Sequence, residues 1–218
     1  MRRRGPEPPP GPPQIQFKPG IAKETLRELA PLLAEEGIDV DNIDVPDLQT
    51  LQEAMNRAVE RHNMARFTPV GQARDLAVTT LRLVIEAVAD GDTALAGAIL
   101  NQVQPESPDN TVATVASCIG LALGLLDDWL SGDDPNAPKT LGEHVRLPAG
   151  HWRGERAAND ILALARKGRA FRSLNTLITS QGGEHVLYGS ALALAAATQT
   201  WAAKTDTSLS ETAHTVIR

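Results

Sequence analysis

Carboxylates gather where a long uncharged stretch of the chain ends. Residues 111–126 carry no charge, and Asp127, Asp128, Asp133 and Asp134 follow them closely. Clustered carboxylates are good ligands for Mg²⁺, which in turn can hold a diphosphate. At a helix C-terminus, however, acidic side chains oppose the helix dipole unless a cation or a basic group faces them. The sequence therefore offers either a metal–diphosphate site at Asp127, Asp128 and Asp133 or a solvated helix end with arginine partners.

This aspartate pattern is similar to one motif of a known enzyme family. Asp127-Asp128-x-x-x-x-Asp133-Asp134 resembles the first aspartate-rich motif of trans-prenyl diphosphate synthases, which would imply Mg²⁺ and a diphosphate substrate. The chain departs from that family in three ways: it lacks a second aspartate-rich motif downstream, it is short at 218 residues, and the neighbouring basic pattern is missing. These departures leave the chain without a family assignment.

A second set of metal-ligating residue types follows. His151 and Glu155 are four residues apart, so on a helix they would share one face, as a metal pair requires. His144 or His185 would have to supply a third ligand; the alternative is a surface hydrogen bond between His151 and Glu155. The single cysteine, Cys118, lies inside the uncharged stretch and is predicted to be a buried core residue rather than a nucleophile.

Charges are unevenly distributed in the second half of the chain. Residues 106–134 contain six acidic residues and no basic one, whereas residues 143–172 contain seven basic residues against three acidic ones. The basic cluster at the predicted turn consists of Arg166, Lys167, Arg169 and Arg172. It is the best candidate for binding an anion, such as a nucleic-acid phosphate bound by the basic region 146–172. The alternative is a turn that pairs with Asp127, Asp128 or another chain.

The elements that position these residues are predicted to be helices. Hydrophobic residues make up 42% of the chain but aromatic residues only 3%, so the core must consist of Leu, Ala, Val and Ile, which favours close helix packing. Apolar residues recur at helical spacing and no segment alternates with period two, so we predict an all-α bundle of about eight helices without a sheet. Segments 111–130 and 184–203 are apolar on all sides and are therefore placed at its centre.

The order of parts repeats in the two halves of the chain. Each half has a medium helix, a glycine turn, a short helix, a loop and an uncharged helix that ends in tryptophan, at Trp129 and at Trp201. Two similar three-helix units would pack their apolar helices together; the alternative is a coincidence between Ala- and Leu-rich helices. The small residues expected at that contact are Gly120, Gly124, Gly189, Ala193 and Ala197.

Individual helices carry further signals. Leu95, Ile99 and Val103 recur every four residues and indicate one apolar face, and Leu76 shares a face with Leu83 in the preceding helix. Helix ends are predicted at Gly37 and Asp90-Gly91, and a capping box at Ser208-x-x-Glu211.

Segment boundaries follow from proline and glycine content. Seven of the fifteen prolines fall in 1–20, which is either a disordered tail or a docking arm. In the second case Arg2, Arg3, Arg4, Ile15 and Phe17 would be its contacts. The remaining predicted segments are a helical pair 21–66, a helical unit 68–130, a linker loop 131–150 and a second unit 151–218, with 21–218 as one compact domain.

These observations favour a non-catalytic helical interaction or assembly protein, with a protein partner or a second copy of itself. The alternatives are a nucleic-acid-binding regulator and a Mg²⁺-dependent enzyme; no other cofactor is expected, and P-loop and dinucleotide-binding glycine motifs are missing. A net charge of −6 argues against broad nucleic-acid coating. One cysteine permits no internal disulfide and no signal peptide is visible, so we expect a cytoplasmic location. The uncharged run is shorter than the roughly 20 residues that a membrane span needs.

Overall fold

The computed structural model describes residues 30–31, 33–39, 53–54, 57–58, 61, 64–103 and 108–218. The chain divides into two compact units, Met1–Val59 and Glu60–Arg218. Regular structure in the described ranges is helical and none of it is strand, so the prediction of an all-α protein is confirmed.

In the unit Met1–Val59, a helix ends at the predicted glycine. Residues 33–35 are helical, and Gly37 has a left-handed φ of +78°, which glycine adopts without steric cost. The N–H of Ile38 donates to the carbonyl of Leu33 at 2.9 Å, the bond of a Schellman C-cap. The helix end at Gly37 is confirmed. The predicted arm residues Arg2, Arg3, Arg4, Ile15 and Phe17 lie outside the described residues.

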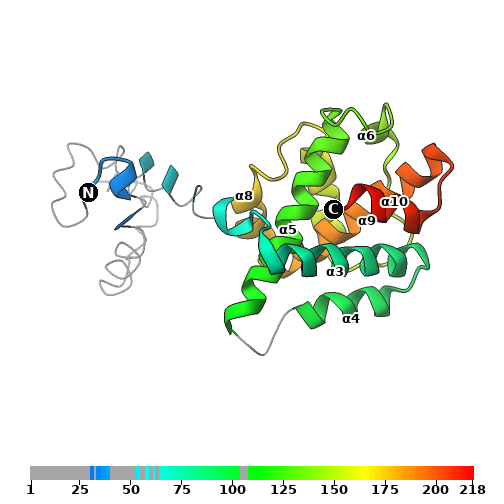
Figure 1. The fold of residues 1–218 in the computed structure, drawn as a ribbon, viewed down its shortest axis with the longest axis horizontal. Helices are drawn as coiled ribbons and strands as arrows, with labels where there is room; N and C mark the ends of the chain where they lie inside the picture. The colour runs from blue at the N-terminus through cyan, green and yellow to red at the C-terminus, as the bar shows by residue number, and fades with distance from the viewer. Residues whose placement is uncertain are drawn as a thin grey trace, which may run out of the picture. The chain divides into compact units, whose positions relative to one another are not determined.

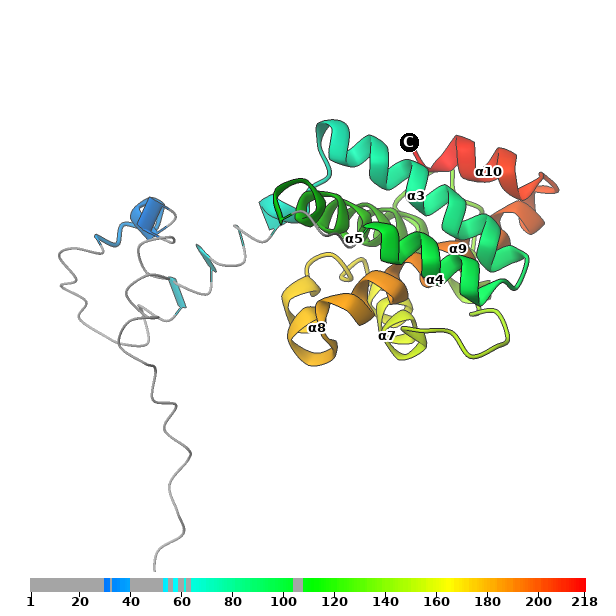
Figure 2. The same ribbon diagram turned by 90° about the horizontal axis from the view of Figure 1, so that it is seen from below.

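The unit Glu60–Arg218 is a bundle built around two contacting helices (Figure 1). Its helices are α3 (Gly71–Ala89), α4 (Thr93–Val103), α5 (Pro108–Ser131), α6 (Leu141–His144), α7 (Glu155–Ala165), α8 (Leu174–Gln181), α9 (Gly183–Thr205) and α10 (Leu209–Val216). α5 and α9 pack against each other, and α3 and α7 each pack against both of them. Figure 2 shows α3 and α10 on one side of this pair and α7 and α8 on the other.

The core lies between α5 and α9. Leu123 and Leu126 of α5 and Leu194 of α9 are 0% exposed. The window Thr114–Ser131 is long and apolar enough to cross a membrane by length and composition, and 67% of it is buried inside this structure. Such burial is typical of the central helix of a bundle.

The aromatic ends of the two central helices touch. The rings of Trp129 and Trp201 lie 5.0 Å apart at 73°, an edge-to-face pair. The glycine contact predicted for these helices is wrong. A Cβ at Gly120 would overlap the carbonyl oxygen of Phe67, and one at Gly189 would lie 2.6 Å from the Cβ of Ala157. These two glycines therefore allow the approach of peripheral segments, not of α5 to α9.

Helix ends were predicted better than helix faces. α3 ends at Ala89 as predicted, and Ser208 is confirmed as a helix N-cap, since the Glu211 N–H donates to its hydroxyl at 3.2 Å. The expected apolar face of α4 is wrong at Leu95, which is 49% exposed, and right at Val103, which is buried, and at Ile99, which packs against the core. Ala96 and Leu100, which were not predicted, complete the buried stripe. α4 is apolar on most sides, so residue spacing alone does not determine which stripe turns inward.

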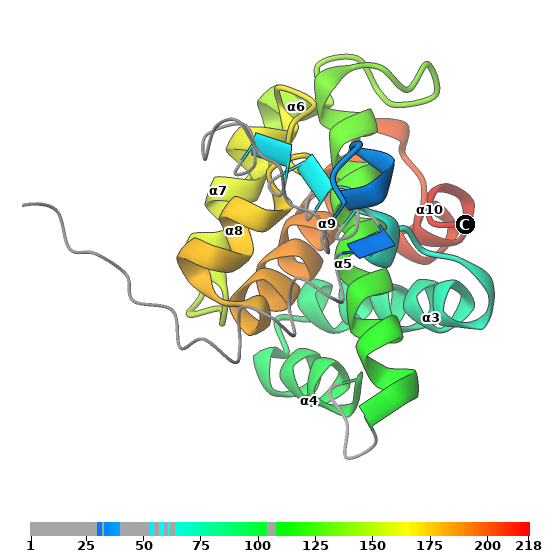
Figure 3. The same ribbon diagram turned by 90° about the vertical axis from the view of Figure 1, so that its left-hand side faces the viewer.

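The segment 131–150, expected to be a linker loop, contains α6 and covers part of the core. Leu141 is 1% exposed and Val145 is fully buried. Figure 3 shows α6 beside the C-terminal end of α5. A Cβ at Gly142 would lie 2.5 Å from the carbonyl oxygen of Leu130, so only glycine allows this approach.

Candidate functional site

Asp127 does not face solvent as a free ligand; it closes the turn between α7 and α8. Its two carboxylate oxygens accept the backbone N–H groups of Ala170 at 2.7 Å and Phe171 at 2.9 Å. The turn predicted to bind an anion therefore already binds one, from the same chain. Asp127 thus contacts this turn, as one interpretation of the sequence expected, but through backbone N–H groups rather than through the basic side chains.

The environment of Asp127 shifts its ionisation in two directions. Burial raises the pKa of this carboxyl above its ordinary value, the two backbone hydrogen bonds lower it, and the neighbouring charge of Asp128 raises it again. The net shift is upward, so burial outweighs the hydrogen bonds.

The other aspartates of the cluster repel one another at the end of α5. Burial raises the pKa of Asp128, and the carboxylates of Asp134 and Asp133 raise it further. The hydroxyl of Ser131 donates to Asp133 at 2.8 Å, and Asp134 accepts from the N–H of Asn136 at 2.8 Å. Asp133 and Asp134 thus each have a local hydrogen-bond partner, whereas the charged form of Asp128 is disfavoured first by burial and then by like charge.

Arg166 holds the short helix α6 in place. Its Nε donates to the carbonyl of Gly142 at 2.7 Å and its Nη2 to that of Val145 at 3.1 Å. Burial, followed by the charge of Arg146, lowers the pKa of the Arg166 guanidinium. Arg146 itself donates to the carbonyl of Val145 at 2.8 Å. One member of the predicted anion-binding cluster is therefore used to bind backbone carbonyls.

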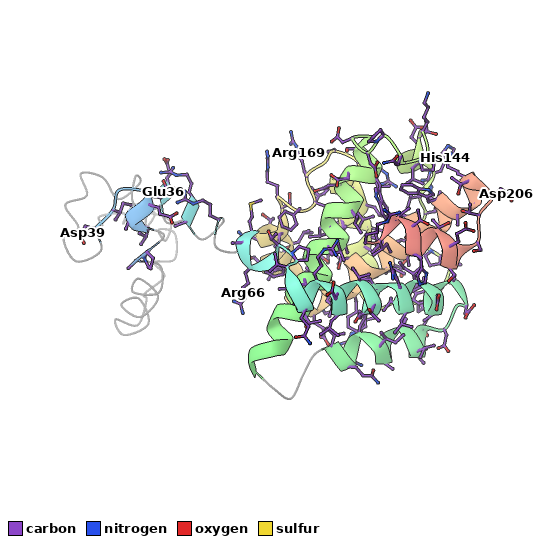
Figure 4. The ribbon with its side chains drawn as sticks, in the orientation of Figure 1. Glu36, Asp39, Arg66, His144, Arg169 and Asp206 are labelled. Carbon is purple, nitrogen blue, oxygen red and sulfur yellow. The ribbon has the colours of Figure 1, made fainter. Side chains whose placement is uncertain are left out.

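The other basic residues of this turn are exposed. They are Lys167, Arg169 and Arg172. The side chain of Arg169 extends away from the ribbon in Figure 4. These three cations remain accessible to an external anion, although the N–H groups at residues 170 and 171 are taken by Asp127.

The predicted histidine–glutamate pair is not on one helix. α7 begins at Glu155, after Gly154 with a left-handed φ of +78°, and His151 lies in the coil before it. The same-face argument therefore does not apply to His151. Across the described ranges, no three His, Cys, Asp or Glu side chains are grouped closely enough to share a metal ion. Cys118 is 0% exposed, and burial raises the pKa of its thiol to about 12.

The structure adds a cavity that no sequence pattern indicated. It measures about 280 Å³ and lies between α3, α4, α9 and the coil before α7. At its edge Tyr188 donates its hydroxyl to Asn101 Oδ1 at 2.6 Å and accepts from Arg153 Nη1 at 3.1 Å. The guanidinium of Arg153 also lies over the Tyr188 ring, 4.4 Å from its centroid.

No family model, curated protein or solved structure matches this chain. The geometry alone therefore has to support any assignment. Two features of the sequence point weakly to the cavity. Tyr188 is the single tyrosine of the chain, and Gly97 is a glycine within a predicted helix. Neither forms a spacing motif, because the groups around the cavity come from four separate segments.

Proposed function

We propose that this chain is a non-catalytic helical interaction protein that associates with a second copy of itself through the outer face of α3 and α4. The position of the exposed large hydrophobic side chains carries this proposal. In the described part of the chain, all of them lie between residues 70 and 95: Val70, Leu76, Leu83 and Leu95. Exposed apolar side chains that share one face are typical of protein contact sites, and Leu76 and Leu83 share a face of α3.

The two exposed leucines of α3 are placed so that they can pair with the same leucines of a second copy. Leu76 and Leu83 are seven residues apart, on the same side of the helix, and each is 48% exposed. The exposed Thr79 lies between them. In an antiparallel pair of α3 helices, Leu76 of one copy would face Leu83 of the other on both sides of Thr79. A self-complementary patch of this kind is what a two-fold dimer requires.

The roles of the charged groups support a protein without catalytic machinery. Asp127 accepts hydrogen bonds from backbone N–H groups, and Arg166 donates to backbone carbonyls. These two candidates for metal and anion binding therefore connect segments of the fold. Cys118, with its raised pKa, lies in the core.

The proposal also includes an internal repeat within the bundle. We infer that residues 68–130 and 151–218 are two similar three-helix units packed around their apolar helices. The contact between Trp129 and Trp201, which end the corresponding helices, supports this. The short helices differ, because α4 packs along α3 whereas α8 packs mainly on α9.

Light scattering tests the association. The molar mass of the wild-type chain is expected to rise with concentration toward a dimer, and Leu76→Glu/Leu83→Glu is expected to remain a monomer with unchanged helicity. Thr176→Glu/Thr179→Glu adds the same charges at exposed positions of α8 and should associate like the wild type. A wild-type chain that is monomeric at every concentration, or a leucine variant that still dimerises, would overturn the proposal.

The proline-rich segment 1–20 is proposed to strengthen this assembly as a docking arm, through Arg2–Arg4, Ile15 and Phe17. Deleting residues 1–20 should then weaken association and leave the helical circular-dichroism signal of the remainder unchanged. Equal association constants with and without the segment would show that it is not an arm.

A nucleic-acid-binding regulator is the second candidate, favoured by the exposed Lys167, Arg169 and Arg172 at one turn. Binding through these cations predicts retention on immobilised DNA that falls steeply with salt, and loss of retention when all three are changed to Gln. No retention at low salt would exclude this candidate.

A further inference from the structure

The cavity beneath α4 has apolar walls. Val84 and Val88 of α3, Leu100 of α4 and Leu192 of α9 form most of them, and its volume is about 280 Å³. Pockets for drug-sized molecules usually measure about 300–1,000 Å³, so this one suits a smaller molecule with an apolar body.

One edge of the cavity is polar and well connected. Tyr188, only 5% exposed, links α9 to Asn101 of α4 at 2.6 Å and to Arg153 at 3.1 Å. Because Asn101 accepts with its oxygen, its amide N–H groups are what it can offer to a ligand. The groups at this edge that can bind a ligand are therefore mainly donors: the Asn101 amide and the Arg153 guanidinium.

Arg153 can exchange its ion-pair partner Glu184 for a ligand at a low cost in free energy. It forms an ion pair with Glu184 in which the two side chains are 47% and 42% exposed. Exposed pairs of this kind contribute little to stability because water and salt screen them. A carboxylate in the cavity could share the guanidinium with Glu184 or replace it.

Gly97 lies where packing does not require a glycine. It is in the middle of α4 and lines the cavity, and a Cβ added there would meet no atom within 4 Å. Glycine inside a helix is unfavourable relative to alanine. Its effect at this position is to leave the cavity open beside the Tyr188 hydroxyl, which lies 3.3 Å from the Gly97 carbonyl oxygen.

Trp152 contributes to the wall of the cavity. Its buried indole N–H has no hydrogen-bond partner within the described residues, but the nitrogen lies beside Gly150, which is outside the cavity lining. This N–H is therefore not assigned to the ligand.

We propose that this cavity binds a small monocarboxylate with an apolar body, such as a medium-chain fatty acid, with the carboxylate at Arg153 and Asn101 and the body against Val84, Val88 and Leu192. The free groups at this edge are mainly donors, which favours an anion over a cation, and the apolar walls disfavour a highly polar anion. This assignment does not depend on the association through α3 and α4.

Calorimetric titration of the full chain with octanoate tests the proposal. Saturable one-to-one binding is expected in the wild type. Gly97→Leu places a side chain in the cavity and should abolish binding, whereas Gln102→Leu, at an exposed position of the same helix, should bind like the wild type. Thermal melts of both variants establish that they are folded.

The charged end is tested separately by Arg153→Gln, which should weaken octanoate by about tenfold or more, as expected for loss of a charged hydrogen bond. Octan-1-ol should bind more weakly than octanoate, and octylamine should not bind. The site is overturned if fatty acids from butanoate to decanoate show no saturable binding, or if a folded Gly97→Leu binds octanoate unchanged. Equal affinity for octanoate and octan-1-ol, or an unchanged Arg153→Gln, would overturn the carboxylate assignment.

Discussion

Adjacent aspartates at the end of α5 have opposite effects on stability. Asp127 accepts two backbone hydrogen bonds, whereas Asp128 is partly buried and meets the charges of Asp134 and Asp133. Asp127→Ala leaves two N–H groups without their acceptor and should lower the free energy of unfolding by about 1–3 kcal/mol. Asp128→Asn should raise it slightly, because it removes like-charge repulsion and an unfavourable charge at a helix C-terminus. Urea unfolding at pH 7 measures both, and a destabilised Asp128→Asn would contradict this assignment.

The gain from Asp128→Asn should depend on pH. The folded-state pKa of Asp128 is raised above the value of 3.8, so the folded chain binds this proton more tightly than the unfolded chain. Ionisation of Asp128 therefore opposes folding, and its cost grows as pH rises from 3.8 through the raised pKa. The advantage of Asp128→Asn should be complete at neutral pH and disappear in acid. An advantage that is constant with pH would mean that ionisation is not its cause.

Cys118 should be unreactive while the protein is folded. Its thiol is fully buried, with a pKa raised to about 12, so little thiolate exists at pH 8. Ellman's reagent should label it only at the rate of unfolding, and fully in denaturant. Rapid labelling of the native protein would show that α5 is not the closed core helix described above.

At the level of the helices, two glycines four residues apart in α5 provide a matched test. A Cβ at Gly120 overlaps the carbonyl of Phe67, whereas one at Gly124 meets no atom within 4 Å. Gly124→Ala should raise stability by about 0.5–1 kcal/mol through helix propensity, and Gly120→Ala should lower it by about 1–3 kcal/mol through steric overlap. Thermal unfolding distinguishes them; a shift of the same sign in both would contradict the packing.

The same helices show what sequence can predict. Helix ends at Gly37, Ala89 and Ser208 were predictable, because glycine conformation and capping are local properties. The buried stripe of α4 was not, since Leu95 and Ala96 are both apolar and the neighbouring helices decide which one is covered. The role of α6 was hidden for a similar reason: Leu141 becomes a core residue only when Gly142 meets Leu130.

For the molecule as a whole, the central pair of helices was predictable from two charge-free stretches. The contacts that the charged residues make in the fold were not. Sequence spacing placed Asp127 and Arg166 in candidate sites for metal or anion. In the fold, each binds the backbone of a loop distant in sequence. The cavity at Tyr188 depends on four segments that meet only in the folded chain. Local patterns contain no information on such contacts.

The measurement that tests the proposed association most directly is oxidative cross-linking of Thr79→Cys. An antiparallel pair of α3 helices would bring position 79 of two copies together, and the native Cys118 is buried and does not compete. Thr79→Cys should form a covalent dimer on non-reducing gels, and Thr176→Cys, at an exposed position of α8, should form little. Equal cross-linking of the two variants would contradict the proposal that copies of this chain meet along α3.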